Sequence, residues 1–200
     1  MNIIVHLMFA VTVRRRIKKT LGFALNLPGF LYGNILPDIS KKYGEHPHYM
    51  KDALTHVVNT KDYLIEQNAY EPLSPYQFAK ELGAINHYLS DFFCLPHTEG
   101  YQGSKTQHGI YEFLMIARYR KGSRAFRTLL LAQGNQLELS DLKAFIIDNN
   151  KAYQDRKASK INDIRFALFA GTKLSESMLT QIAALPEAAS EPLLPVSYIA

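Results

Sequence analysis

The segment 74–92 restricts most strongly what this chain can fold into. Its first residues, SPYQ, form a strong helix start, with serine as the cap, proline in the first turn and glutamine completing a capping box. The helix that follows is apolar on almost every side, which predicts a central, buried helix. It nevertheless carries His87 and Asp91, which are four residues apart and therefore share one face. Because an ionised aspartate is very costly to bury alone, Asp91 requires a cation or several hydrogen-bond donors.

A second pair with the same spacing follows this helix. His108 and Glu112 begin another expected helix, and His97 lies between the two pairs in the connecting loop. The two pairs and the loop histidine together offer five ligands of the kind that suits zinc. Cys94 also lies at a spacing that zinc sites use, but a free cysteine is more often a small buried apolar residue.

Further histidines and a carboxylate lie upstream. His6 is surrounded by apolar residues in an expected helix over 3–21, where a lone histidine is usually part of the core. Asp38 follows a proline, so it is either a helix cap or a metal-binding carboxylate held by a rigid turn. His46 and His48 flank a proline in the next loop, where histidines serve as metal ligands or as ordinary surface residues.

Apolar residues recur at helical spacing along most of the chain. Besides the central helix, this periodicity predicts helices over 3–21, 50–67, 107–131, 140–155, 162–170 and 175–185. Prolines and glycines predict a structured loop over 25–40. No strand-like alternation of useful length occurs, so the expected fold class is all-α, a multi-helix bundle. We expect one domain over 1–185 and a proline-rich, loosely ordered tail over 186–200.

Composition restricts the setting in which the protein works. No apolar run approaches the ~20 residues that a membrane-spanning helix needs. The first residues do not resemble a secretory signal, because their positive charges follow the apolar part instead of preceding it. A single cysteine fits a reducing compartment, and we therefore expect a cytoplasmic location.

The net charge of +5 includes two concentrated basic runs. The first consists of Arg14, Arg15, Arg16, Lys18 and Lys19, and the second of Arg118, Arg120, Lys121, Arg124 and Arg127. Such runs are usually solvated helix faces. They are also compatible with peripheral contact with an anionic membrane surface or another phosphate-bearing partner.

The metal-ligand pattern is similar to that of a known family. The segments HYLSDFFCLPH and HGIYE resemble the zinc-dependent phospholipase C family, whose metal cage also occurs in zinc-dependent single-strand nucleases. The upstream GNILPDI and the pair His48-Tyr49 extend this resemblance over roughly residues 6 to 115. The resemblance implies an all-α bundle enclosing two or three zinc ions that cleave a phosphodiester.

The resemblance also implies a distribution of ligands. It assigns a first zinc to Asp38, His48, His87 and Asp91, and a second zinc to His97, His108 and Glu112. A third ion would lie between Asp91 and His6. Secreted members complete that third site with their processed first residue, and this chain carries no processing signal, so two or three ions are both open. His46 is an alternative to His48.

This chemistry leads to several hypotheses. Zinc ions would neutralise a phosphodiester, activate a water and stabilise the leaving oxygen. Asp38 or Glu112 could orient that water as general base. We therefore expect a metal-dependent hydrolase that cleaves phospholipid headgroups. The alternatives are a nuclease or nucleotide phosphodiesterase with the same cage, a non-catalytic helical protein held together by zinc, and a metal-free arrangement of capping and surface groups.

Overall fold

The computed structural model describes residues 1–133 and 141–185, and within these ranges every regular element is a helix. The elements are α1 (Ile3–Leu21), α2 (Leu27–Gly33), α3 (Leu36–Ile39), α4 (Met50–Tyr70), α5 (Pro75–Asp91), the short 3-10 helix η1 (Leu95–His97), α6 (Lys105–Gln133), α7 (Leu142–Gln154) and α8 (Lys160–Ala183). The all-α prediction is confirmed. The predicted tail 186–200 lies outside the described residues, and the single domain over 1–185 stays a prediction.

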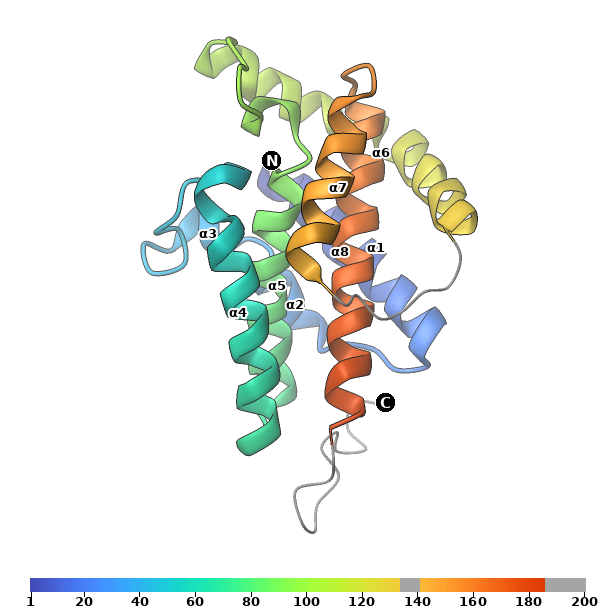
Figure 1. Ribbon diagram of the computed structural model, residues 1–200. Helices are drawn as coiled ribbons and strands as arrows, with labels where there is room; N and C mark the ends of the chain where they lie inside the picture. Colours follow the sequence, from blue (N-terminus) through green and yellow to red (C-terminus); the bar gives the residue numbers. More distant parts are fainter. Residues whose placement is uncertain (134–140, 186–200) are drawn as a thin grey trace.

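Helix α5 is the centre of the bundle, as its apolar sequence predicts. It packs against α2, α4 and α8, and Figure 1 shows it enclosed by these helices. Every residue of α5 from Leu82 to Asp91 is buried. The predicted capping box is present, because the Ser74 hydroxyl accepts a hydrogen bond from the backbone N–H of Gln77. The end of α5 that carries His87 and Asp91 therefore lies inside the molecule.

The prediction of a loop over 25–40 is wrong, since this segment forms α2 and α3. The Asn26 side chain caps α2 by accepting a hydrogen bond from the Gly29 N–H at 3.0 Å. Its glycines, which suggest a loop when read locally, instead let α2 approach α5 closely. Tertiary packing thus outweighs the low helix propensity of glycine in this segment.

Gly33 is the position where α2 and α5 come closest. A Cβ atom there would overlap the backbone carbonyl of Lys80 and lie 2.9 Å from the Cα of Gly83. Because both obstacles are backbone of a buried helix, we expect Gly33→Ala to lower the free energy of unfolding by about 1–3 kcal/mol. Urea unfolding measures this. Gly109→Ala is the control: that Cβ would meet no atom within 4 Å, so it should stabilise the protein by about 0.5–1 kcal/mol. Equal stability of the two variants would contradict the close approach.

Helix α8 is continuous, although the sequence predicts two helices, over 162–170 and 175–185. Gly171 lies between these ranges, where a Cβ atom would be only 2.5 Å from the Asn86 side-chain oxygen. Asn86 donates a hydrogen bond to the Ser175 hydroxyl at 3.0 Å. The glycine therefore allows α5 to pack closely against a single long helix, and it does not interrupt that helix.

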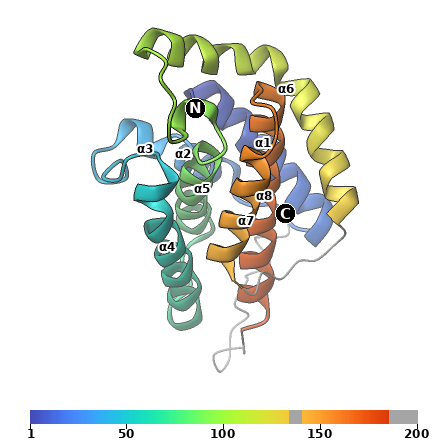
Figure 2. The ribbon, with the colours of Figure 1, turned by 45° about the horizontal axis from the view of Figure 1, so that its top comes forward.

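Helices α1 and α6 lie side by side, which brings together the first and the last residues of the predicted ligand set. The Tyr119 hydroxyl of α6 donates to the backbone carbonyl of Met8 at 2.7 Å and lies 2.7 Å from the Thr12 hydroxyl of α1. Figure 2 shows α6 crossing the top of the bundle and then bending downward. The first turns of both helices consequently meet near the end of α5.

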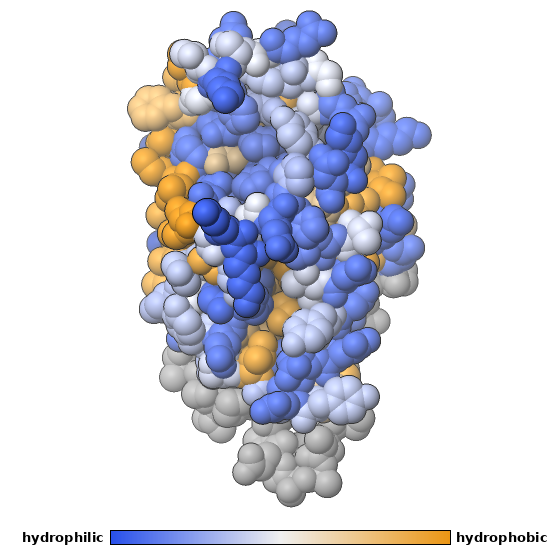
Figure 3. All heavy atoms as spheres, turned by 90° about the vertical axis from the view of Figure 1, so that its left-hand side faces the viewer, coloured by the Kyte–Doolittle hydropathy of each residue, from blue (hydrophilic) through white to orange (hydrophobic). Residues whose placement is uncertain are grey.

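The outer surface is that of an amphipathic bundle. The face formed by α3 and α4 is mainly hydrophilic, with hydrophobic side chains gathered along one edge (Figure 3). Helix α4 buries Ala53, Leu54, Val57 and Leu64 and turns its polar side outward. Within the described ranges, none of the helices combines the length and apolar composition needed to cross a membrane.

Candidate metal centre

The eight residues predicted to bind metal converge at one end of α5. They come from α1, α3, the loop before α4, α5, η1 and α6, and they are His6, Asp38, His48, His87, Asp91, His97, His108 and Glu112. Contacts between these side chains join positions as far apart as 6 and 91. The convergence that the sequence spacing suggests is therefore present in three dimensions.

His87 is fixed by a backbone contact behind it. Its Nδ1 lies 2.8 Å from the carbonyl of Asn34, to which it donates. The opposite atom, Nε2, faces the centre, 3.6 Å from an oxygen of Asp38 and 3.5 Å from an oxygen of Asp91. Burial lowers the pKa of His87 to about 3, so its imidazole is neutral. A neutral imidazole held by its second nitrogen is the usual form of a metal-ligating histidine.

Asp91 is fully buried and faces two groups of partners with its two oxygens. Oδ2 lies 2.8 Å from His48 Nδ1, while Oδ1 contacts the amino group of Met1 and lies 3.5 Å from His6 Nε2. Burial alone would raise the pKa of Asp91, but the positively charged Met1 amino group and the electrostatic interaction with His97 hold it well below its usual value. Asp91 is thus a carboxylate positioned to join two neighbouring cation sites.

His6 offers the clearest test of whether the cluster fits a metal. Its ring is completely buried and stacks on His87 with 3.9 Å between centroids. Nδ1 lies 3.2 Å from the Ser90 hydroxyl, but Nε2, which faces Asp91, has no hydrogen-bond partner among the described residues. Burial and the nearby His87 lower the pKa of His6 well below its usual value. A neutral, buried nitrogen without a partner is costly unless a cation binds it, so the residues fit a metal.

Glu112 holds the second group of ligands together. Its Oε1 lies 3.0 Å from His97 Nε2 and 2.6 Å from His108 Nε2. Burial would raise the pKa of Glu112, but the hydrogen bond from His97 outweighs it and lowers the pKa.

Cys94 lies close enough to join His97 and Glu112 in a metal group, yet burial raises the pKa of its thiol well above normal. That protonated state favours the apolar interpretation of Cys94.

The Met1 amino group was not recognised from the sequence as part of this cluster. It contacts Asp91 and lies 3.3 Å from His97 Nε2 and 3.5 Å from a Glu112 oxygen. Burial alone would lower its pKa, but the nearby Asp91 and Glu112 charges raise it to about 11. The protonated amine therefore supplies positive charge where two buried carboxylates require it.

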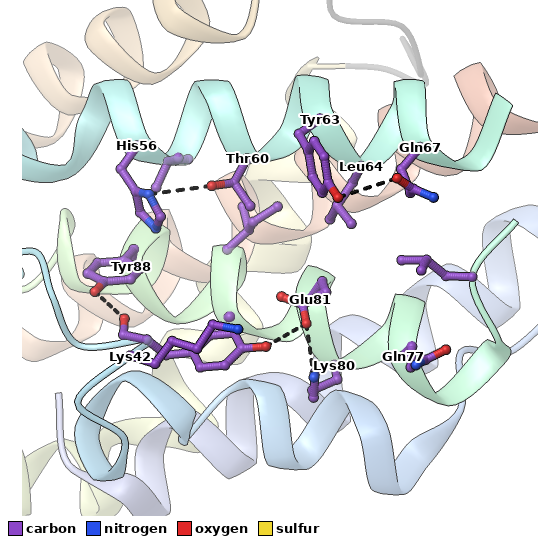
Figure 4. Close-up of a pocket in the computed structure, with 15 residues that line it drawn as sticks. Lys42, His56, Thr60, Tyr63, Leu64, Gln67, Gln77, Lys80, Glu81 and Tyr88 are labelled. Atoms are coloured by element: carbon purple, nitrogen blue, oxygen red, sulfur yellow. Dashed lines mark hydrogen bonds and ion pairs between the residues drawn. The ribbon is translucent and has the colours of Figure 1, made fainter. Parts of the chain in front are cut away.

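The geometry favours His48 over His46 as a member of the cluster. His48 Nδ1 faces the centre, whereas the His46 ring lies tilted against that of His56, with 4.2 Å between centroids. Figure 4 shows His56 facing Tyr88 at one end of a pocket of about 380 Å³ between α4 and α5. His46 and His56 are therefore grouped with each other and stand apart from the cluster.

Asp163 of α8 supports the second ligand group from behind, and sequence reasoning missed it. Its carboxylate is completely buried and accepts hydrogen bonds from the hydroxyls of Tyr111 and Tyr153, at 2.7 and 3.0 Å, and from the Leu95 N–H at 3.3 Å. Leu95 begins η1, which ends in His97, and Tyr111 precedes Glu112. Read locally, an aspartate in the first turn of a helix is an ordinary stabilising residue, which conceals this role.

The centre combines a buried floor with an accessible side. The Asp38, His48 and His108 side chains are 24%, 20% and 32% exposed, while those of His6, His87 and Asp91 are 0% exposed. Structural zinc sites are usually closed and cysteine-rich, whereas catalytic ones keep an open position. A carboxylate-rich cluster with one accessible side is the arrangement expected for metal-dependent hydrolysis.

Comparison with known proteins agrees with this geometry. Searches of curated proteins and of solved structures give no match to the chain. Residues 5–160 match the family described as zinc dependent phospholipase C, and this range includes all eight converging residues. The match covers well over half of the chain. With its helical bundle and its cluster of histidines and carboxylates, the chain belongs to the zinc-dependent phospholipase C family.

Proposed function

We propose that this protein is a zinc-dependent phosphodiester hydrolase that cleaves the headgroups of phospholipids. The observation that carries the proposal is the buried Nε2 of His6, which lies beside the Asp91 carboxylate and has no hydrogen-bond partner among the described residues, within a cluster that opens to solvent on one side. Such a donor set suits bound metal cations, and family membership makes zinc the expected metal. A cytoplasmic location stays a prediction that rests on the single cysteine.

We divide the cluster into three ion sites, two of which share Asp91. We assign the first to Asp38, His48, His87 and Asp91, the second to His97, His108 and Glu112, and the third to His6 and Asp91. When bound, the ions would neutralise the phosphate and lower the pKa of the attacking water. The third site has the fewest side chains of its own, so we expect its ion to be held most weakly.

The proposed general base is Asp38. Its side chain is partly exposed on the open side of the centre, 3.6 Å from His87 Nε2 and 3.9 Å from His48 Nδ1. Glu112 is a weaker candidate because one of its oxygens already faces two histidines at 2.6 and 3.0 Å. A base must reach both the water and the solvent-accessible substrate, and this favours the more exposed carboxylate.

A small hollow beside the centre supports a compact substrate group. It has a volume of about 200 Å³, and its walls include His97, Tyr49, Phe92 and Asn150. The rings of Tyr49 and His97 are 6.0 Å apart, so a group in this hollow would lie next to the proposed second zinc site. Aromatic and polar walls of this size suit a phospholipid headgroup better than an extended polynucleotide.

Metal analysis and two substrates test the proposal. Protein purified without chelator should contain two or three zinc ions and release a phosphorylated headgroup from phospholipid vesicles. A chelator should abolish release, and added zinc should restore it. Zinc at or below one ion per chain would contradict the cluster. Cleavage of single-stranded DNA without cleavage of lipid would replace the phospholipase by the nuclease alternative. Bound zinc without either activity would favour the non-catalytic alternative.

A further inference from the structure

The fold brings together two basic runs that are about a hundred residues apart in the sequence. Ten of the 23 lysines and arginines lie on α1 between positions 14 and 19 and on α6 between positions 118 and 127. The hydrogen bond from the Tyr119 hydroxyl to the Met8 carbonyl shows that these two helices are neighbours. Since the whole chain has a net charge of only +5, positive charge is concentrated on this side of the molecule.

A groove of about 620 Å³ lies between the two basic segments, and we refer to it as the basic groove. Its lining combines cations with apolar side chains and consists of Thr12, Arg15, Arg16, Lys19, Ser123, Phe126, Arg127, Leu130 and Leu131. Among the residues that the structure describes, no acidic side chain lines it. Neither α1 nor the part of α6 that follows Glu112 contains an aspartate or glutamate.

Within the part of the chain that the structure describes, most cations of the basic groove have no carboxylate partner. Arg16 is the exception, with its Nε 3.5 Å from a buried oxygen of Glu176. In the ranges 1–133 and 141–185, no ion pair joins Arg15, Lys19 or Arg127 to a carboxylate. Their side chains are exposed, so the groove is free to attract an anion.

The apolar part of the groove determines which anion fits. Phe126 and Leu130 are buried and form an apolar base, while Leu131 is 85% exposed. A single-stranded nucleic acid would call for exposed aromatic rings along an extended basic track. A ligand with a phosphate at one end and a hydrocarbon at the other satisfies both the cations and the leucines.

We propose that the basic groove binds an anionic phospholipid and thereby docks the protein on a membrane surface. The groove is separate from the metal centre, because Arg15 lies nine residues beyond His6, about 14 Å along the axis of α1. The same two helices carry His6, His108 and Glu112 in their first turns. Docking through the groove would therefore hold the metal centre close to the lipid, and this consequence rests on the proposed function.

Vesicle flotation of the full-length, zinc-loaded protein tests the docking site. Wild type should float with phosphatidylcholine vesicles only when phosphatidylglycerol is added. Arg15→Gln combined with Arg127→Gln should weaken this binding about 25-fold, or about fivefold for each cation removed. Leu131→Gln should weaken it about tenfold without changing the charge. The matched control is Lys143→Gln with Lys151→Gln, which removes two exposed cations from α7 and should leave binding unchanged.

Two further readouts separate this site from the catalytic proposal. Hydrolysis of a soluble phosphodiester should be equal in the groove variants, the control and wild type, and a thermal melt verifies that each variant is folded. Equal vesicle binding by the groove and control variants would overturn the docking site. So would binding of a single-stranded oligonucleotide that depends on Arg15 and Arg127 when vesicles do not bind. Inactivity of every protein on the soluble substrate would overturn the hydrolase alone.

Discussion

Replacing Asp91 with asparagine is expected to lower phosphodiester hydrolysis about 10³-fold, because electrostatic stabilisation by the metals is worth several kcal/mol of the activation barrier. Asp91 faces His48 with one carboxylate oxygen and His6 with the other, so its loss removes charge from two proposed ion sites. Zinc content should fall together with activity. A shift in KM alone would contradict this central role, since it would leave the chemical step intact.

The same variant tests the metal through stability. Zinc that binds only the folded state stabilises it by about 4 kcal/mol per site at a thousandfold excess over Kd. We therefore expect zinc to raise the melting temperature of wild type strongly and that of Asp91→Asn much less. Asp148→Asn is the matched control, because Asp148 is an exposed aspartate on α7. An equal zinc-induced shift in all three proteins would show that Asp91 does not hold an ion.

Replacing Asp163 with alanine is expected to lower the free energy of unfolding by about 4 kcal/mol, because one buried and two partly buried donors lose their acceptor at about 1–3 kcal/mol each. The loosened η1 and α6 should also weaken the second proposed zinc site. Urea unfolding and metal analysis measure the two effects. Tyr111→Phe removes only one of the three donors and should cost about 1 kcal/mol.

A conservative variant separates the effect of the Asp163 hydrogen bonds from the effect of its side-chain size. Asp163→Asn keeps one acceptor oxygen of similar size, so we expect it to recover part of the lost stability and zinc content. Asp155→Ala changes an exposed aspartate just after α7 and should leave both quantities unchanged. If Asp163→Ala retained wild-type stability, the network that joins α8 to η1 and α6 would not be holding the centre.

The misread elements share one physical cause. Glycine lowers local helix propensity; together with the prolines it made 25–40 look like a loop, and Gly171 falls between the two helices predicted within α8. At Gly33 and Gly171 the absence of a Cβ atom instead allows another helix to pack at very short distance. The stabilising contacts are made with the partner helix, and no local sequence pattern around the glycine reveals them.

By itself, the sequence determined what depends on neighbours within a few residues. The capping box at Ser74, the burial of α5 and the shared faces of the two histidine–carboxylate pairs all follow from helix geometry, which repeats every 3.6 residues. Those pairs were sufficient to predict a metal centre and to suggest the family.

Only the tertiary structure decided the relations between distant segments. It placed the Met1 amine among the carboxylates, favoured His48 over His46, and set Asp163 behind His97. It also joined the basic runs of α1 and α6 into one groove. Such contacts depend on how whole helices pack, and packing is selected by complementary surfaces that lie far apart in the chain.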